Sequence, residues 1–167
     1  MKQAFTLIEL LVVIAIVGIL SAVVLTSLNG ARLSARAAAA IQTLSEIEKA
    51  IERECGLNDN CPTNGISSIS SLVSSGLVPS LEPFVGAEIG GVPITYTANT
   101  NTWVFDNCSG GLNNAGVNLR LSGADSALMN KIDEVVDDGN GMVCGKIRLA
   151  AAGVYYWSIA TDASNFP

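Results

Sequence analysis

The densest cluster of oxygen-bearing side chains in the chain is the segment Asp137-Asp138-Gly139-Asn140-Gly141. Carboxylate and amide oxygens supplied by one loop are the ligands that Ca²⁺ prefers, so Asp137, Asp138 and Asn140 are candidate calcium ligands. Their spacing differs from that of the EF-hand loop. The alternative is a turn that follows a helix, in which a glycine of the segment adopts a positive φ. Both interpretations stay open, and no other cofactor is expected.

The sequence offers no constellation for catalysis. The chain contains no histidine, which removes the commonest general base and metal ligand. The serines of residues 67–75 come without a G-x-S-x-G motif, and no glycine-rich phosphate loop carries its lysine. Three acidic residues could act as paired acids, but their helical spacing favours a solvated face: Asp125, Asp133 and Glu134. We therefore expect a protein that is not an enzyme.

Composition limits the partners that the chain can bind. The 167 residues carry a net charge of −6, and an acidic chain without histidine has little affinity for the phosphates of nucleic acids. Four aromatic residues form a surface patch for partners or, alternatively, lie partly in the core and partly on strand surfaces. These residues are Trp103, Tyr155, Tyr156 and Trp157.

A long apolar segment dominates the amino-terminal part. No charged residue occurs between Leu10 and Ala31, and a helix of that length crosses the roughly 30 Å hydrocarbon core of a bilayer. Glu9 stands at the start of this segment, where a carboxylate is costly unless it is paired or close to the interface, and such residues are usually functional. Cations lie on both sides of the segment, so the positive-inside rule gives no clear orientation.

The helix is expected to continue to about Glu54, because apolar residues recur there at helical spacing. Among them, Leu44, Ile47 and Ile51 would cover the apolar face of an antiparallel sheet. The strands of this sheet are predicted at residues 94–97, 102–105, 117–121, 143–149 and 154–160, with short helices at 66–76 and 124–136 and a connector at 77–91. The pattern predicts an α+β fold with the helix first and the sheet later.

Four cysteines all follow the apolar segment: Cys55, Cys61, Cys108 and Cys144. This placement fits a domain on the oxidising side of a membrane. Four cysteines allow three pairings, of which we favour Cys55 with Cys61 and Cys108 with Cys144. The alternative is free buried thiols. Neither spacing suits a zinc site.

The amino terminus closely resembles the leader and first helix of type IV pilins and pseudopilins. The residues that carry the resemblance are Lys2 and Ala4, followed by Phe5-Thr6-Leu7-Ile8-Glu9-Leu10-Leu11-Val12-Val13-Ile14-Ala15-Ile16. The resemblance covers residues 1 to about 36. In that family a membrane peptidase cuts before the Phe and methylates the new amino terminus. The resemblance implies cleavage between Ala4 and Phe5 and N-methylation of Phe5, although the family usually has Gly at the position of Ala4.

The resemblance also implies a division of the chain and a function. Residues 1–4 would be the leader, 5–31 the membrane-spanning and filament-core half-helix, and 32–167 the pilin globular domain. The precursor would lie in the cytoplasmic membrane with its amino terminus in the cytoplasm, in contact with lipid, the prepilin peptidase and the inner-membrane assembly platform. It would then form a homo-oligomeric helical filament at the cell surface or in the periplasm, in which Glu9 pairs with the Phe5 amine of a neighbour.

Two rival functions remain open at this stage. A type IV pilus subunit would serve adhesion, twitching motility or DNA uptake, whereas a type II secretion pseudopilin would serve protein secretion. Some pseudopilins bind calcium in a carboxy-terminal loop, which gives the candidate ligands a precedent. A signal-anchored extracellular binding domain is the second rival. It is disfavoured because the carboxylate of Glu9 would then be costly without serving a function.

Overall fold

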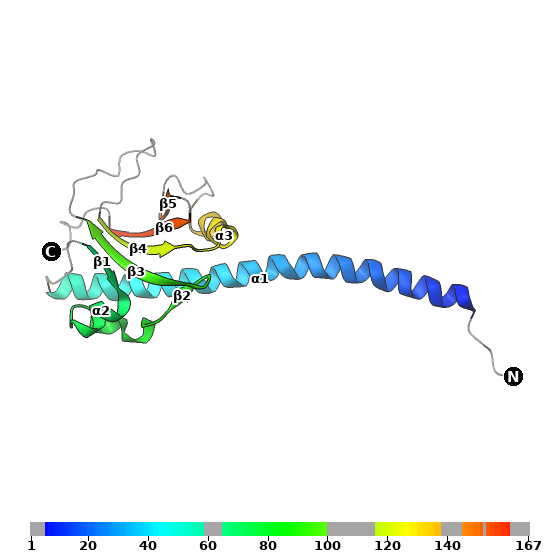
Figure 1. The fold of residues 1–167 in the computed structure, drawn as a ribbon, viewed down its shortest axis with the longest axis horizontal. Coiled ribbons are helices and arrows are strands. Elements are labelled where there is room, and N and C mark those ends of the chain that lie inside the picture. Colours follow the sequence, from blue (N-terminus) through cyan, green and yellow to red (C-terminus); the bar gives the residue numbers. More distant parts are fainter. Residues whose placement is uncertain (1–5, 59–64, 100–115, 138–144, 152, 161–167) are drawn as a thin grey trace. The chain divides into compact units, whose positions relative to one another are not determined.

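The computed structural model describes residues 6–58, 65–99, 116–137, 145–151 and 153–160. The chain divides into two compact units, Met1–Arg36 and Ala37–Pro167. Helix α1, Leu7–Asn58, contributes residues to both of them (Figure 1). Each unit is described by itself.

The first unit consists of the amino-terminal part of α1. Its apolar side chains are exposed all round the helix: Leu7 is 79% exposed, Ile8 73% and Ile19 68%. By length and composition this helix is apolar enough to cross a membrane. Side chains of this kind require lipid or other apolar helices around them, because contiguous apolar surface of this extent is rare on soluble monomers.

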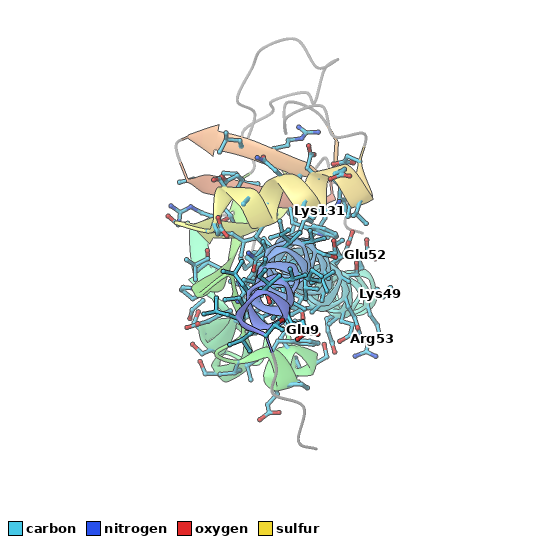
Figure 2. The ribbon with its side chains drawn as sticks, turned by 90° about the vertical axis from the view of Figure 1, so that its right-hand side faces the viewer. Glu9, Lys49, Glu52, Arg53 and Lys131 are labelled. Carbon is cyan, nitrogen blue, oxygen red and sulfur yellow. The ribbon has the colours of Figure 1, made fainter. Side chains whose placement is uncertain are left out.

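The second unit begins with the remainder of α1, which has one buried face. Ala37, Ala40, Leu44, Ile47 and Ile51 are all buried, as their helical spacing predicts. Polar side chains occupy the exposed face: Gln42, Glu46, Lys49, Glu52 and Arg53. Figure 2 labels three of them, which lie close together on the outside of the helix. The helix ends at Asn58, one turn beyond the expected end.

An antiparallel sheet supplies the rest of the fold. Its strands are β1 Gly65–Ser68, β2 Glu88–Ile89, β3 Val92–Asn99, β4 Gly116–Ser122, β5 Ile147–Ala151 and β6 Val154–Ala160. The order is β1-β3-β4-β6-β5, and β2 pairs with β3 outside this path. A long amino-terminal helix followed by an antiparallel sheet confirms the predicted α+β, pilin-like architecture.

Cross-strand rows of large side chains build the core of the sheet. Tyr96 on β3 lies opposite Leu119 on β4, which lies opposite Trp157 on β6. All three are buried, and burial raises the pKa of Tyr96. Tyr155 and Tyr156 are buried as well, so these aromatic residues belong to the interior and not to a surface patch. Trp103 lies outside the described residues.

Three short helices complete the described chain: α2 Ile69–Ser74, the 3₁₀ helix η1 Pro79–Phe84 and α3 Ser126–Val136. The segment 66–76 was expected to be entirely helical, but its first part is strand β1, which pairs with β3. Local sequence cannot reveal such a pairing, because the partner strand is distant in the chain. Ser68 then caps α2 by accepting a bond from the Ser71 N–H at 3.1 Å. The expected strand at 102–105 lies outside the described residues.

Helix α3 corrects one expectation about its acidic residues. Asp133 is only 2% exposed, whereas a solvated face was expected for it. Ile132 and Asp133 share the inner face with Met129 because they follow it by three and four residues. Asp125 instead caps the helix through a 3.0 Å bond from the Ala127 N–H. Glu134 is exposed and pairs with Lys131 at 2.8 Å. The structure therefore does not bring the three acids together on one solvated face.

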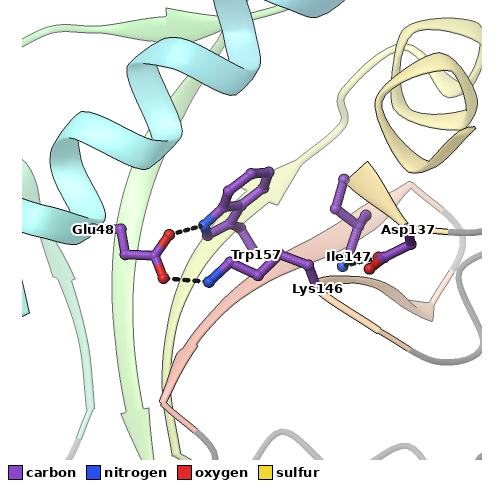
Figure 3. Close-up of polar contacts among 5 residues, drawn as sticks. All are labelled: Glu48, Asp137, Lys146, Ile147 and Trp157. Carbon is purple, nitrogen blue, oxygen red and sulfur yellow. Dashed lines mark hydrogen bonds and ion pairs between the residues drawn. The ribbon is translucent and has the colours of Figure 1, made fainter. Parts of the chain in front are cut away.

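A polar cluster joins α1 to the sheet (Figure 3). One oxygen of Glu48 on α1 accepts a bond from the Trp157 indole N–H at 3.0 Å, and the other pairs with the Lys146 ammonium. That ammonium also lies 5.4 Å from the centroid of the Trp157 ring. The Glu48 side chain is only 13% exposed, and a carboxylate this sheltered needs partners of this kind.

This cluster generates a stability prediction. In Glu48→Leu the ammonium of Lys146 and the indole N–H lose their shared acceptor, so we expect the free energy of unfolding to fall by about 1–3 kcal/mol. Urea denaturation of the full chain in detergent micelles measures the change. The matched control is Glu52→Leu on the exposed face of the same helix, and equal stability of the two variants would contradict the proposed contribution of Glu48.

Candidate processing and assembly site

Helix α1 begins with three reciprocal hydrogen bonds between Thr6 and Glu9. The Thr6 backbone N–H and the Thr6 hydroxyl each donate to Oε2 of Glu9 at 2.8 Å. The Glu9 backbone N–H lies 3.3 Å from the Thr6 hydroxyl oxygen. Side chains at these two positions form a capping box, which satisfies backbone donors that a helix start leaves without partners. The capping box therefore makes Leu7 the first helical residue, two positions after Phe5.

The same geometry shows how a carboxylate is tolerated at the start of an apolar helix. Glu9 lies in the first turn of α1, where the positive end of the helix dipole favours an anion. The capping box supplies hydrogen bonds but no compensating cation. Once water is excluded by lipid or by neighbouring helices, an ion pair becomes much stronger. In such surroundings a cation placed next to Glu9 would interact with it more strongly than in water.

The predicted processing site, Ala4 and Phe5, lies outside the described residues. Cleavage between them, methylation of Phe5 and pairing of its amine with Glu9 therefore stay predictions. Thr6 was quoted within the motif, but its cap to Glu9 was not anticipated. The signal was present in the sequence, because Thr followed three residues later by Glu before an apolar run is the pattern of a capping box.

The candidate calcium ligands have only one described member. Asp137 follows α3, and its Oδ2 accepts a 3.0 Å bond from the Ile147 N–H at the start of β5. Gly145 adopts a φ of +96°, and a Cβ there would lie 2.5 Å from the Asp137 carboxyl carbon. Burial lowers the pKa of Arg148, while the nearby Asp137 opposes this shift. Asp137 therefore stabilises the approach of α3 to β5.

Metal binding and disulfide formation depend largely on residues that the structure does not describe. Asp138 and Asn140 lie outside the described residues, and the part that is described contains no group of three potential metal-ligating side chains. Calcium binding stays a prediction. Cys61, Cys108 and Cys144 also lie outside, so the disulfide pairing stays a prediction too.

Comparison with known proteins supports the interpretation of the amino terminus. A model of the prokaryotic N-terminal methylation motif matches residues 1–25. No curated protein and no solved structure matches the chain. The motif, together with the pilin-like α+β architecture, supports a type IV pilin-like prepilin. It points to a structural subunit held in a membrane by an apolar amino-terminal helix.

The capping box generates a prediction for the first turn of α1. Thr6→Val keeps the shape of the side chain but removes the hydroxyl, so the first turn should fray. We expect the backbone amides of Glu9 and Leu10, which bond to the Thr6 hydroxyl and carbonyl, to exchange about fivefold faster, which corresponds to the typical contribution of an N-cap. Hydrogen exchange of the full chain in micelles measures this. Thr6→Ser is the control that retains the cap, and unchanged exchange in Thr6→Val would contradict the role of the hydroxyl.

Proposed function

We propose that this protein is a structural subunit of a type IV pilus-like filament. The observation that carries the proposal is the methylation motif at residues 1–25, which stands at the head of a helix whose apolar side chains are exposed. A motif of this kind is a signal for cleavage and methylation of the amino terminus. The exposed apolar side chains of the helix must be kept from water. A filament of like subunits supplies their burial.

Before assembly, the chain is a prepilin in the cytoplasmic membrane with its amino terminus in the cytoplasm. Prepilin peptidase cleaves between Ala4 and Phe5 and methylates the new amino terminus. All four cysteines follow the apolar segment, so this orientation places them on the oxidising side, where disulfides persist. The globular domain then stands outside the membrane, available to the assembly platform.

During assembly, the apolar half-helices leave lipid and pack against one another. Lipid is already apolar, so packing between helices and specific polar contacts must favour the filament. Glu9 provides such a contact by pairing with the Phe5 amine of a neighbouring subunit. This pair is desolvated among helices and also selects the register between subunits. The sheet domains then form the outside of the filament.

The two filament types have different outcomes for the cell. As a pilus subunit the protein serves adhesion, twitching motility or DNA uptake, and as a pseudopilus subunit it serves protein secretion. Glu9 favours a repeating subunit over a tip subunit, which can lack this residue. Deletion of the coding sequence distinguishes the two types, because loss of long surface filaments indicates a pilus and loss of secreted proteins indicates a pseudopilus.

The assembly step generates a prediction for Glu9. Glu9→Val should leave the amount of protein in the membrane fraction unchanged and lower the yield of sheared filaments at least about tenfold, because the amine of the neighbour loses its only proposed counter-ion. Electron microscopy and immunoblotting of the sheared fraction measure the yield. Glu46→Val, on the exposed face of the same helix, is the matched control. Normal filament yield from Glu9→Val would remove the proposed role.

A further inference from the structure

Two arginines stand directly after the apolar segment of α1. Between Glu9 and Glu46 the only charged residues are Arg32 and Arg36. They are one turn apart, so their side chains lie on the same side of the helix. Both are exposed. Two like charges at this spacing repel each other, which makes the pair a cost unless an anion lies close to both.

No such anion comes from the described part of the chain itself. The positions three and four residues before and after either arginine hold no acidic residue. None of the ion pairs among the described residues involves Arg32 or Arg36. The pair Lys49 and Arg53 has the same spacing on the same helix, yet Glu52 lies between them in the sequence and Arg53 lies 4.0 Å from Glu54. The arginine pair therefore differs from an ordinary solvated charged face.

The position of the pair follows from the length of the uncharged segment. From Leu10 to Ala31 there are about 22 residues, and at a rise of 1.5 Å per residue they span roughly 33 Å. The hydrocarbon core is about 30 Å thick. If Glu9 lies at one boundary of this core, Arg32 lies at the other. Arg36, one turn further on, then lies within the headgroup layer.

We propose that Arg32 and Arg36 bind the phosphate of an anionic phospholipid at the boundary where the globular domain leaves the membrane. The inference rests on the proposed function, because it requires that α1 span a bilayer. The guanidinium group presents a planar fork of donors that binds phosphate bidentately. Cations close to a leaflet that contains anionic lipid are attracted to its headgroups, and with the amino terminus in the cytoplasm Arg32 and Arg36 lie at the outer leaflet. A phosphate close to both arginines also relieves their mutual repulsion.

The surroundings favour lipid over a second protein as the occupant. The arginines continue directly from a segment whose side chains are exposed all round the helix, and which is therefore lipid-facing in the precursor. The side chains of Arg32 and Arg36 are themselves exposed, although Ala37 and Ala40 on the following turn are buried. The lipid contact fixes the depth of the helix in the membrane before assembly.

The test compares two double variants of the full chain that carry the same change in charge. Native mass spectrometry in detergent, with phosphatidylglycerol and phosphatidylcholine added in turn, measures the preference of each protein for the anionic lipid. In Arg32→Gln/Arg36→Gln this preference should fall by about fivefold for each arginine removed. In Lys49→Gln/Arg53→Gln it should stay at the value of the unchanged protein. Arg32→Lys/Arg36→Lys should keep part of the preference, because lysine retains the charge but not the fork.

Three results would overturn the inference. One is an equal lipid preference in the arginine variant and the unchanged protein, and another is an equal loss in the lysine–arginine control. A third is a loss of self-association in detergent without any loss of lipid preference, which would assign the arginines to a neighbouring copy. Flotation with phosphatidylcholine vesicles distinguishes failure of the lipid site from failure of the proposed function. Failure of the unchanged protein to float would count against the membrane-held precursor itself, whereas flotation without preference for phosphatidylglycerol overturns only the lipid site.

Discussion

The structure depends on one requirement: the apolar side chains at the start of α1 must be kept from water, although the described residues of the first unit leave them exposed. The uncharged segment matches a bilayer in length. In the proposed function, lipid meets this requirement in the precursor and a bundle of like helices meets it in the filament. In that proposal Glu9 limits which bundle can form, because a carboxylate buried with the helices needs a positive partner at a defined level.

The apolar side chains in the second half of α1 must also be kept from water, but here their own unit covers them. Leu44, Ile47 and Ile51 lie on one face and are covered within their own unit, so this part of the helix needs no second molecule. Glu48 adds a polar contact to this packing, since its carboxylate accepts from Trp157 and pairs with Lys146. One continuous helix thus joins a segment that requires external partners to a segment that folds with its own sheet.

Sequence reasoning succeeded where periodicity is strong and local. It predicted the buried face of α1, the strand at Val117–Leu121 and the helix ending at Val136, because each shows the spacing of its element. It missed β1, whose four residues become a strand only by pairing with β3. It also missed the roles of Glu48, Asp133 and Asp137. Their hydrogen-bond partners or their burial come from other segments of the chain. The neighbouring sequence of a carboxylate does not indicate whether it will accept a bond from an indole, lie in the core or bind a backbone amide.

The central claim is that the chain is a processed filament subunit, and the most direct test is the amino terminus of the mature protein. Intact-mass and amino-terminal analysis should be carried out on protein from its native membrane or from the sheared surface fraction. If the chain is a processed filament subunit, the mature protein begins at N-methylated Phe5. A chain that still begins at Met1 would contradict processing at Ala4, and a chain that begins between Ala22 and Ala31 would show an ordinary secreted domain that has lost the helix on which the account depends.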